Sequence, residues 1–270
     1  MRIGHDPAIR ATLIVTTYNR KDALELVLLS ALAQREPPHE IIVADDGSTG
    51  DTRALVEALA AGASVPVRHC WHQDTGFRLA AIRNRALAMA GGEYVVMVDG
   101  DLVLHPEFMR DHRRAARPGR FVQGGRALLS EGVTRAALRD RRIDFGPFEP
   151  GTRNRKNALR SGWLSRLASH RGRSIYRVRG ANLAFWRADV LRVNGFNEDF
   201  EGWGREDSEF AARMQNAGVA RWNLKFAAVA YHLWHPEASR RMLERNQRIL
   251  EETVTRRATW CANGIDRHLG

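Results

Sequence analysis

Residues 93–108 read EYVVMVDGDLVLHPEF, and this stretch decides how the first half of the chain is organised. The apolar run at 94–98 has the length and the β-branched content of a strand that is buried on both faces. It ends in Asp99 and Asp101, which one glycine separates. Burying a carboxylate costs free energy unless it is paired, and two adjacent carboxylates repel each other unless a cation lies between them. The stretch therefore predicts a core strand whose carboxyl end holds a cation.

The residues before this stretch alternate between apolar β-type runs and segments with helical periodicity. We expect strands at 11–18, 40–45, 65–71 and 93–99, and helices at 21–34, within 47–62 and at 78–92. This alternation is typical of an α/β fold with a mostly parallel central sheet that helices cover on both faces. Ligands of such sheets bind beyond the carboxyl ends of the strands.

Polar side chains gather directly after these expected strands. The three earlier strands run into TTYNR at 16–20, DDGS at 45–48 and QDTGF at 73–77. One crevice would therefore collect carboxylates, hydroxyls and amides beside Asp99 and Asp101. The chain has neither the glycine-rich dinucleotide fingerprint nor the lysine-containing phosphate loop, which argues against a nicotinamide enzyme and a P-loop enzyme.

The second half of the chain has a different pattern. We expect a helix in 105–117, a strand at 121–129, a short strand and helix after 181, a helix at about 206–216, a strand in 225–236 and an amphipathic helix in 237–258. No run approaches the roughly 20 apolar residues of a membrane span. Asp6 and Pro7 interrupt any apolar leader, so we expect no export signal, and two cysteines without a metal or disulfide pattern suit a reducing cytoplasm.

The formal charge of +11 is concentrated in one segment. Residues 139–180 hold 12 Lys and Arg against 3 Asp and Glu, a net charge of +9. A localised basic segment indicates an anionic partner, such as phosphates, an acidic glycan, an anionic membrane surface or nucleic acid. The alternative is a solvated, mobile loop.

Four groups of residues are candidates for chemistry. The carboxylates of Asp99 and Asp101 suit Mg²⁺ or Mn²⁺, although Asp and Gly are also common in plain turns. Asp45 and Asp46 can accept hydrogen bonds from a ribose hydroxyl or a base N–H, or can belong to the cap of the next helix.

The other two groups lie in the second half. GWGREDSE at 202–209 places Glu206 and Asp207 at a helix start, where the helix dipole alone could explain them. The exposed aromatic that we expect at Trp203 suggests a sugar or base nearby, and a carboxylate beside it could act as general base. His232 and His235 can ligate a divalent metal, or can be ordinary core or surface histidines.

Together these stretches resemble a nucleotide-sugar-dependent glycosyltransferase of the GT-A fold, in the large inverting family 2. The N-terminal resemblance lies in VTTYNR, VADDGST, DTGFRLAAIRNRALAMAGGEYVVMVDGD and HPEFM. RGANLAFWRADVLRVNGFNEDFEGWGREDSEFAARMQNAG resembles the C-terminal galactosyltransferase-like region, which is also seen in bacterial chondroitin-type polymerases and animal β-1,4-galactosyltransferases. The resemblance covers about residues 11–236 and is weakest in the basic segment.

The resemblance implies a role for each matching residue. The residues implied to bind the nucleotide sugar are Thr16, Tyr18, Asn19, Asp45 or Asp46, Phe77, Arg78, Arg83, Asp99 on the ribose side, and Trp203, which would stack on a sugar. Asp101 would ligate Mn²⁺ or Mg²⁺ beside Asp99, with His235 as second ligand and His232 as its alternate. Asp207 would be the catalytic base, with Glu206 next to it.

The resemblance also implies a domain plan and a function. It implies one GT-A domain, 1–270, with a nucleotide-sugar half at 10–105, an acceptor half at 106–236 that contains the basic insertion, and a C-terminal helix at 237–270. It implies transfer from a UDP-sugar to a hydroxyl of a glycan or lipid-linked glycan, with inversion, in bacterial envelope polysaccharide or lipopolysaccharide synthesis.

Other interpretations remain open. A retaining transferase or a non-catalytic nucleotide-sugar binder would use the same scaffold. The basic charge also suggests a nucleic-acid-binding protein, but the chain has no interleaved aromatic platform, helix-turn-helix or zinc pattern, so we expect no nucleic acid. We expect the chain to be cytoplasmic and peripheral on the inner face of the membrane, with 139–180 meeting anionic lipid.

Overall fold

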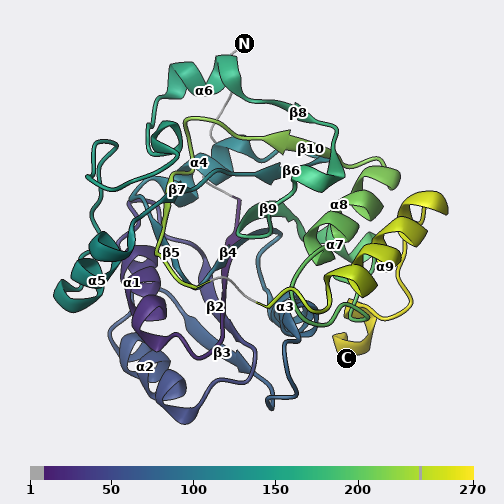
Figure 1. Ribbon diagram of the computed structural model, residues 1–270, viewed down its shortest axis with the longest axis horizontal. Helices are drawn as coiled ribbons and strands as arrows, with labels where there is room; N and C mark the ends of the chain where they lie inside the picture. The colour runs from purple at the N-terminus through teal and green to yellow at the C-terminus, as the bar shows by residue number, and fades with distance from the viewer. Residues whose placement is uncertain (1–8, 237–238) are drawn as a thin grey trace.

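The structure is a computed structural model that describes residues 9–236 and 239–270. Its centre is an eight-stranded sheet, and a three-stranded sheet lies beside it (Figure 1). In spatial order the large sheet contains β3 (Val67–Trp71), β2 (Glu40–Asp45), β1 (Ala11–Thr17), β4 (Tyr94–Asp99), β9 (Asn182–Trp186), β6 (Arg120–Gln123), β10 (Ala220–Asn223) and β8 (His170–Gly172). The small sheet contains β5 (Leu102–Leu104), β11 (Ala230–His232) and β7 (Ala127–Leu128).

The first four strands of the chain are parallel to one another. Their carboxyl ends therefore lie at one edge of the sheet, where Thr16 of β1 pairs with Asp99 of β4 and Thr17 pairs with Asp45 of β2. β9 then runs antiparallel to β4. The expected α/β fold with a mainly parallel sheet is confirmed, and the polar strand ends do meet at one edge.

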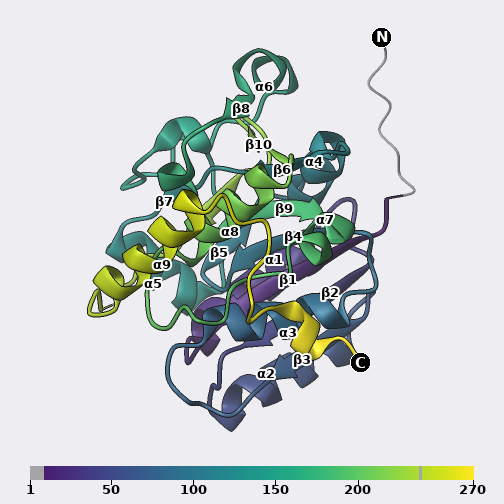
Figure 2. The ribbon, with the colours of Figure 1, turned by 90° about the vertical axis from the view of Figure 1, so that its right-hand side faces the viewer.

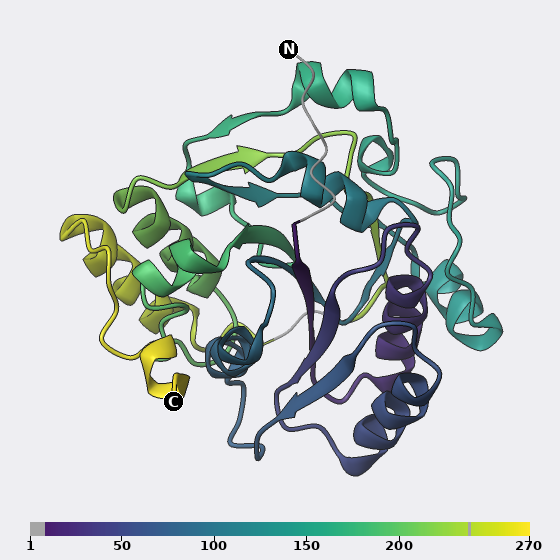
Figure 3. The ribbon, with the colours of Figure 1, turned by 180° about the vertical axis from the view of Figure 1, so that it is seen from behind.

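Helices cover both faces of the large sheet, as the views from the front and from behind show (Figures 1 and 3). Side chains alternate along β1, so Leu13 and Val15 face one helical layer and Ile14 faces the other. The first layer contains α1 (Lys21–Leu32), α2 (Gly50–Ala61) and α4 (Phe108–Ala115). The second contains α3 (Leu79–Met89), α7 (Arg187–Arg192) and α8 (Glu206–Asn216), with α9 (Leu243–Thr255) packed against α8.

Two expected strands of the second half are wrong in extent. The strand expected at 121–129 is split between β6 and β7, which belong to different sheets, because the glycines between them let the chain turn past Asn182. The strand expected in 225–236 is confined to β11, since Phe226 and Ala228 have left-handed φ angles of 54° and 48° that interrupt an extended run. The expected helix in 237–258 corresponds to α9, and its residues 237 and 238 lie outside the described ones.

The basic segment 139–180 consists of short regular pieces joined by loops, so it is not one continuous loop. It contains the end of α5 (Glu131–Asp140), which the sequence analysis missed, and then η1 (Arg155–Asn157), α6 (Gly162–Ala168), β8 and η2 (Ile175–Arg177). Figure 2 shows α6 carried beyond the sheet at one end of the molecule. No helix in the described part of the chain has the length and apolar character that crossing a bilayer requires. The last element is η3 (Ile265–His268), which packs on α3.

Candidate active site

The turn between Asp99 and Asp101 is fixed by its close approach to β1. A Cβ atom on Gly100 would lie 2.5 Å from the carbonyl oxygen of Thr16, so only glycine fits between the two acids. The Thr16 hydroxyl lies 3.3 Å from Asp99 Oδ1 and donates to it. The DGD sequence is therefore a tight turn pressed against the neighbouring strand.

Asp101 and two histidines form a compact cluster. The Nε2 atom of His235 lies 3.1 Å from Asp101 Oδ2, and that of His232 lies 3.6 Å from the same oxygen. β11 brings His232 there because it pairs with β5, which directly follows the turn. One ligand atom from each of the three residues lies within 4.8 Å of the others. The structure thus brings together three of the four residues for which the sequence suggests a metal. Asp99 is not in the cluster and instead faces Thr16 and Arg83.

This donor set fits a divalent ion. Asp101 Oδ1 is buried and has no hydrogen-bond partner in the described part of the chain, so an acceptor is left over for a cation. Burial lowers the pKa of His232, which keeps its imidazole in the neutral form that binds metals. A carboxylate with two imidazoles suits Mn²⁺ better than Mg²⁺, which prefers oxygen ligands.

Arg83 joins the DGD turn to the second acidic stretch. Its side chain is 1% exposed, and it lies in α3 between the sheet and α8. One guanidinium nitrogen is 3.4 Å from Asp99 Oδ1 and another is 3.6 Å from Glu206 Oε1. The guanidinium also lies 5.2 Å from the centre of the Phe196 ring. Arg83 is therefore a buried cation between two carboxylates, and its expected contact with the diphosphate stays a prediction.

Asp207 is held by the start of β9. The turn before it has left-handed φ angles at Gly204 (105°) and Arg205 (76°), which lead into α8. Asp207 Oδ2 accepts a hydrogen bond of 2.7 Å from the backbone N–H of Gly180. The next carbonyl along, that of Ala181, accepts the backbone N–H of Asp99 at 3.3 Å. The two acidic stretches thus meet on consecutive residues. Asp207 also lies in the first turn of α8, so its role as base stays a prediction beside the helix-dipole interpretation.

The acids at the start of α8 have raised pKa values. Burial, helped by the charge of Asp207, raises the pKa of Glu206 to about 7. Burial also raises the pKa of Asp207. The positive charge of Arg83 opposes the rise in both residues. A buried carboxylate with a raised pKa is a better proton acceptor than an ordinary one.

The two acids after β2 are both buried and hydrogen-bonded within the protein. Asp45 accepts from the Ser48 backbone N–H and pairs with His69 at 2.9 Å. Asp46 pairs with His72 at 2.7 Å and accepts from the Arg78 backbone N–H. Asp45 therefore closes a turn before α2, whereas the N-cap of α2 is Thr49 without a side-chain cap, so neither acid caps the helix. The nucleoside contact of either acid stays a prediction.

The other candidates for donor binding lie on the loops around these acids. Tyr18 is exposed and its hydroxyl donates to Asp74, while the backbone N–H of Asn19 donates to Ser48 Oγ. These two hydrogen bonds connect the loop after β1 to the loops after β2 and β3.

Loops from the two halves also contact each other directly. The carbonyl of Phe77 accepts the backbone N–H of Gly202, and Arg78 pairs with Glu201 at 2.7 Å. Trp203 is 42% exposed, as expected, and the Arg240 guanidinium lies 5.5 Å from its ring centre.

Sequence reasoning missed two contributors. Gly180 holds Asp207 through its backbone N–H, and no side-chain pattern could indicate this. The positive charge of Arg126 acts on Asp101 and His232, yet its surroundings in GGRALL carry no recognisable motif.

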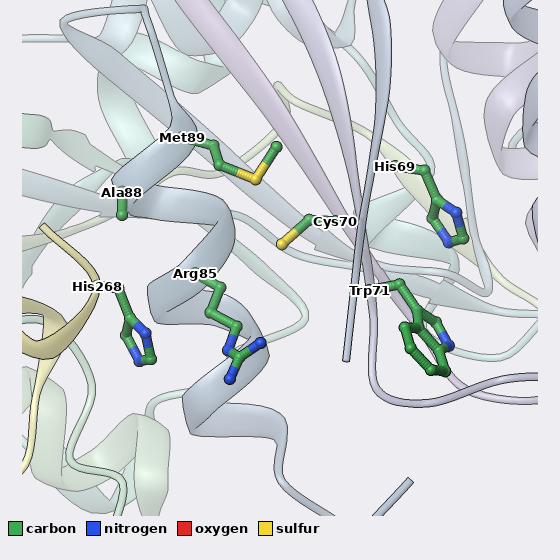
Figure 4. Close-up of a pocket in the computed structure, with 7 residues that line it drawn as sticks. All are labelled: His69, Cys70, Trp71, Arg85, Ala88, Met89 and His268. Atoms are coloured by element: carbon green, nitrogen blue, oxygen red, sulfur yellow. The ribbon is translucent and has the colours of Figure 1, made fainter. Parts of the chain in front are cut away.

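A separate hollow of about 430 Å³ lies between β3 and α3 (Figure 4). Figure 4 shows Cys70 directed toward α3, whereas His69 and Trp71 point to the other side of the strand. Burial raises the pKa of the Cys70 thiol to about 11, so it is not a nucleophile at neutral pH. Two lining residues contact the end of β2 and the residues after it: His69 bonds Asp45, and the Trp71 indole N–H donates to the carbonyl of Ser48. It is lined by His69, Cys70, Trp71, Arg85, Ala88, Met89 and His268.

Residues 12–178, more than half of the chain, match the family described as Glycosyl transferase family 2. The chain belongs to glycosyl transferase family 2. Residues 167–236 also match a family described as the N-terminal domain of galactosyltransferase. Both parts of the resemblance seen in the sequence are therefore confirmed.

Two curated relatives of this family 2 chain are longer proteins. It is 26% identical over 234 residues to validoxylamine A glucosyltransferase of Streptomyces hygroscopicus subsp. limoneus, covering 80% of this chain and 49% of the relative. It is 23% identical over 239 residues to chondroitin synthase of Escherichia coli, covering 82% of this chain and 34% of the relative. The chain thus spans about half, or less, of the length of these relatives.

Solved structures share the fold. The mannosyltransferase PcManGT from Pyrobaculum calidifontis, in complex with GDP-Man and Mn²⁺, superposes with a TM-score of 0.58 at 22% identity, covering 86% of this chain and 59% of the other. Residues 1–349 of Staphylococcus aureus TarS, in complex with UDP, superpose with a TM-score of 0.56 at 19% identity. The match covers 89% of this chain and 64% of the other. The family 2 chain therefore has the GT-A fold.

Proposed function

We propose that this chain is a metal-dependent inverting glycosyltransferase that moves a sugar from a UDP-sugar to a hydroxyl of a glycan or lipid-linked glycan. One observation carries the proposal: Asp207 and the Asp99–Asp101 turn meet on Gly180 and Ala181, with a buried arginine between the two acidic stretches. A metal cluster and a proton acceptor on opposite sides of one crevice are the parts that such a transfer needs.

Asp101, His232 and His235 would hold the divalent ion. When bound, the ion supplies positive charge that offsets the negative charge of the diphosphate. The choice of Mn²⁺ is supported by the two imidazoles and by the Mn²⁺ in the mannosyltransferase complex. Asp99 lies beside this cluster and faces Arg83 and Thr16, which leaves Asp101 as the principal carboxylate ligand.

Asp207 would act as the general base. The acceptor oxygen forms a bond to the anomeric carbon of the donor, the bond from that carbon to the diphosphate oxygen breaks, and UDP leaves. The acceptor proton passes to the Asp207 carboxylate, whose raised pKa favours this transfer. Attack from the face opposite the diphosphate inverts the anomeric carbon, so an α-linked donor would give a β-glycoside.

The loops around the strand ends would bind the donor. Support for UDP comes from the TarS complex, although the mannosyltransferase complex holds GDP-Man. Trp203 offers an exposed aromatic face for a sugar ring. The remaining donor-binding residues would be Thr16, Tyr18, Asn19, Asp45 or Asp46, Phe77, Arg78 and Asp99.

The acceptor would be a bacterial envelope glycan, in polysaccharide or lipopolysaccharide synthesis. The relatives named chondroitin synthase and hyaluronan synthase support a polysaccharide product. A lipid-linked acceptor would place the enzyme on the cytoplasmic face of the membrane, with segment 139–180 toward the lipid.

The deciding experiment measures UDP release from a panel of UDP-sugars with Mn²⁺ and candidate glycan acceptors, and then determines the product anomer by NMR. Asp207→Asn should reduce kcat by about 10²-fold or more, because it removes a general base. Asp189→Asn, which changes an acid in the first turn of α7, serves as the matched control.

Three outcomes would contradict the proposal. Full turnover in Asp207→Asn would remove its role as base. Retained configuration would favour the retaining alternative. Donor binding without turnover would favour a nucleotide-sugar binder.

A further inference from the structure

The segment 151–180 has a one-sided charge. It holds nine Lys and Arg residues and no Asp or Glu, and all nine basic residues are exposed. Within the described part of the chain, Arg160 alone of the nine forms an ion pair, with Asp111 and Glu107. The other eight are Arg153, Arg155, Lys156, Arg166, Arg171, Arg173, Arg177 and Arg179. These eight charges are therefore not neutralised by ion pairs with the described residues.

The same segment presents an apolar pair to solvent. Trp163 and Leu167 lie four residues apart on α6 and therefore on one face of the helix. They are 69% and 68% exposed, and α6 has no buried residue. Exposing a tryptophan and a leucine together on one short helix forgoes the free energy of burying them, which indicates that another surface covers them.

α6 is hydrogen-bonded at both ends although none of its residues is buried. The Ser161 side chain caps its first turn by accepting from the Leu164 backbone N–H. The Ser161 backbone N–H donates to the carbonyl of Phe226, and the Lys225 backbone N–H donates to Ser169 Oγ. Both ends of α6 are thus fixed to the link between β10 and β11. All three views place α6 at the outer margin of the molecule (Figures 1, 2 and 3).

We propose that α6 and its flanking arginines dock this chain on an anionic phospholipid surface, with Trp163 and Leu167 entering the headgroup region. Tryptophan favours the membrane interface, and clustered arginines bind anionic headgroups. A soluble polyanion would explain the arginines but would leave the apolar pair uncovered. The segment is joined to the rest of the fold near β7, where the Asn157 side chain donates to the carbonyl of Arg126.

The test is co-sedimentation of the full chain with vesicles of phosphatidylglycerol and phosphatidylcholine, compared with phosphatidylcholine alone. We expect binding to the anionic vesicles only, and weaker binding at high salt. Trp163→Ser with Leu167→Ser should weaken it about tenfold or more, because the apolar contact is lost. The matched control is Trp260→Ser with Leu269→Ser, which changes an exposed apolar pair at the other end of the chain.

Charge is tested separately. Arg171→Gln with Arg173→Gln should weaken vesicle binding about tenfold or more. The reason is that each basic residue near an anionic membrane contributes roughly 1 kcal/mol to the binding free energy. Arg248→Gln in α9 with Arg256→Gln at its C-cap removes the same charge elsewhere and should have little effect. An equal loss of vesicle binding in both double variants would mean that binding depends on the net charge of the chain and not on the α6 surface.

Insertion has its own readout. Vesicles with brominated acyl chains should quench the fluorescence of the wild-type chain, and Trp163→Phe should lose that quenching while still binding. Three results would overturn the proposal: no vesicle binding, unchanged binding in the Trp163 and Leu167 double variant, or binding to dextran sulfate without any quenching by brominated lipid. The last would identify a soluble-polyanion site. Vesicle binding needs no turnover, so this proposal and the transferase proposal fail independently.

Discussion

At the scale of single residues, the buried charge of Arg83 acts on the two carboxylates at the start of α8. Its guanidinium faces Asp99 and Glu206, and it opposes the rise in pKa that burial causes in Glu206 and Asp207. A buried cation with several carboxylate neighbours is costly to remove, because its partners are left unpaired in a medium of low dielectric.

Replacing this charge should therefore change a pH profile. In Arg83→Met the pKa of Asp207 should rise further, so the acid limb of kcat/KM should move to higher pH. Unfolding free energy should fall by about 3 kcal/mol, the usual effect of breaking a buried ion pair. Arg85→Met, on the exposed side of the same helix, is the control. An unmoved acid limb in a folded Arg83→Met protein would show that Arg83 does not act on the base.

Glu206 should make stability fall as pH rises. Because its pKa is raised to about 7 in the folded chain, the folded state binds a proton between the ordinary carboxyl pKa and pH 7 that the unfolded state has released. Its contribution is thus fully present at low pH and is lost as pH rises through about 7. Glu206→Gln should match the wild type near pH 4 and be more stable at pH 8, by on the order of 2 kcal/mol. Urea unfolding of both proteins at both pH values measures this. An equal difference in unfolding free energy between variant and wild type at pH 4 and pH 8 would contradict the prediction.

At the scale of elements, the site depends on how closely the turn after β4 approaches β1. The carboxylates of Asp99 and Asp101 are positioned by a backbone contact in which Gly100 lies against the carbonyl of Thr16. Register between the two strands places Thr16 opposite Asp99. The pairing of β1 with β4 therefore determines where the two acids lie.

Gly100→Ala tests this approach. The added methyl group cannot fit, so the turn must move, and we expect a loss of about 2 kcal/mol in unfolding free energy together with weaker Mn²⁺ binding. Gly132→Ala in α5 meets open space and should be neutral, or more stable by up to about 1 kcal/mol, because alanine is the better helix former. Thermal unfolding with and without Mn²⁺ compares the two variants. If Gly100→Ala behaved like Gly132→Ala, the close approach would have no energetic consequence.

At the scale of the whole molecule, the metal cluster connects two distant parts of the chain. Asp101 follows the fourth strand of the parallel half, whereas His232 and His235 come from β11 and the residues after it. An ion bound by all three would add a link that the unfolded chain lacks.

Metal should therefore stabilise the protein. At about 100 times the dissociation constant, Mn²⁺ should raise the unfolding free energy by about 2.7 kcal/mol, and EDTA should reverse the rise. Asp101→Asn and His235→Ala should abolish the shift in Tm, while His39→Ala, an exposed histidine elsewhere, should keep it. A shift that survives in Asp101→Asn would place the ion at another site.

The elements of the first half were predictable because their signals are local. The apolar runs and helical periodicities at 11–99 correspond to β1 to β4 and α1 to α3 within a few residues at each end. An apolar side chain every second residue in a buried strand, or on one face of a helix, follows from burial alone and needs no knowledge of the partner. Asp99 and Asp101 were identified as carboxylates at the end of a buried strand, where burial is costly. Glu206 and Asp207 were identified from the GWGREDSE stretch and from the family resemblance.

What the sequence by itself determined is thus the order and type of most elements and the identity of the candidate ligands and acids. Tertiary structure alone decided that Arg83 would face Asp99 and Glu206, that Gly180 would hold Asp207, and that the run at 121–129 would divide between two sheets. These features depend on contacts between residues far apart in the chain, and the free energy of such contacts comes from packing that no local pattern contains.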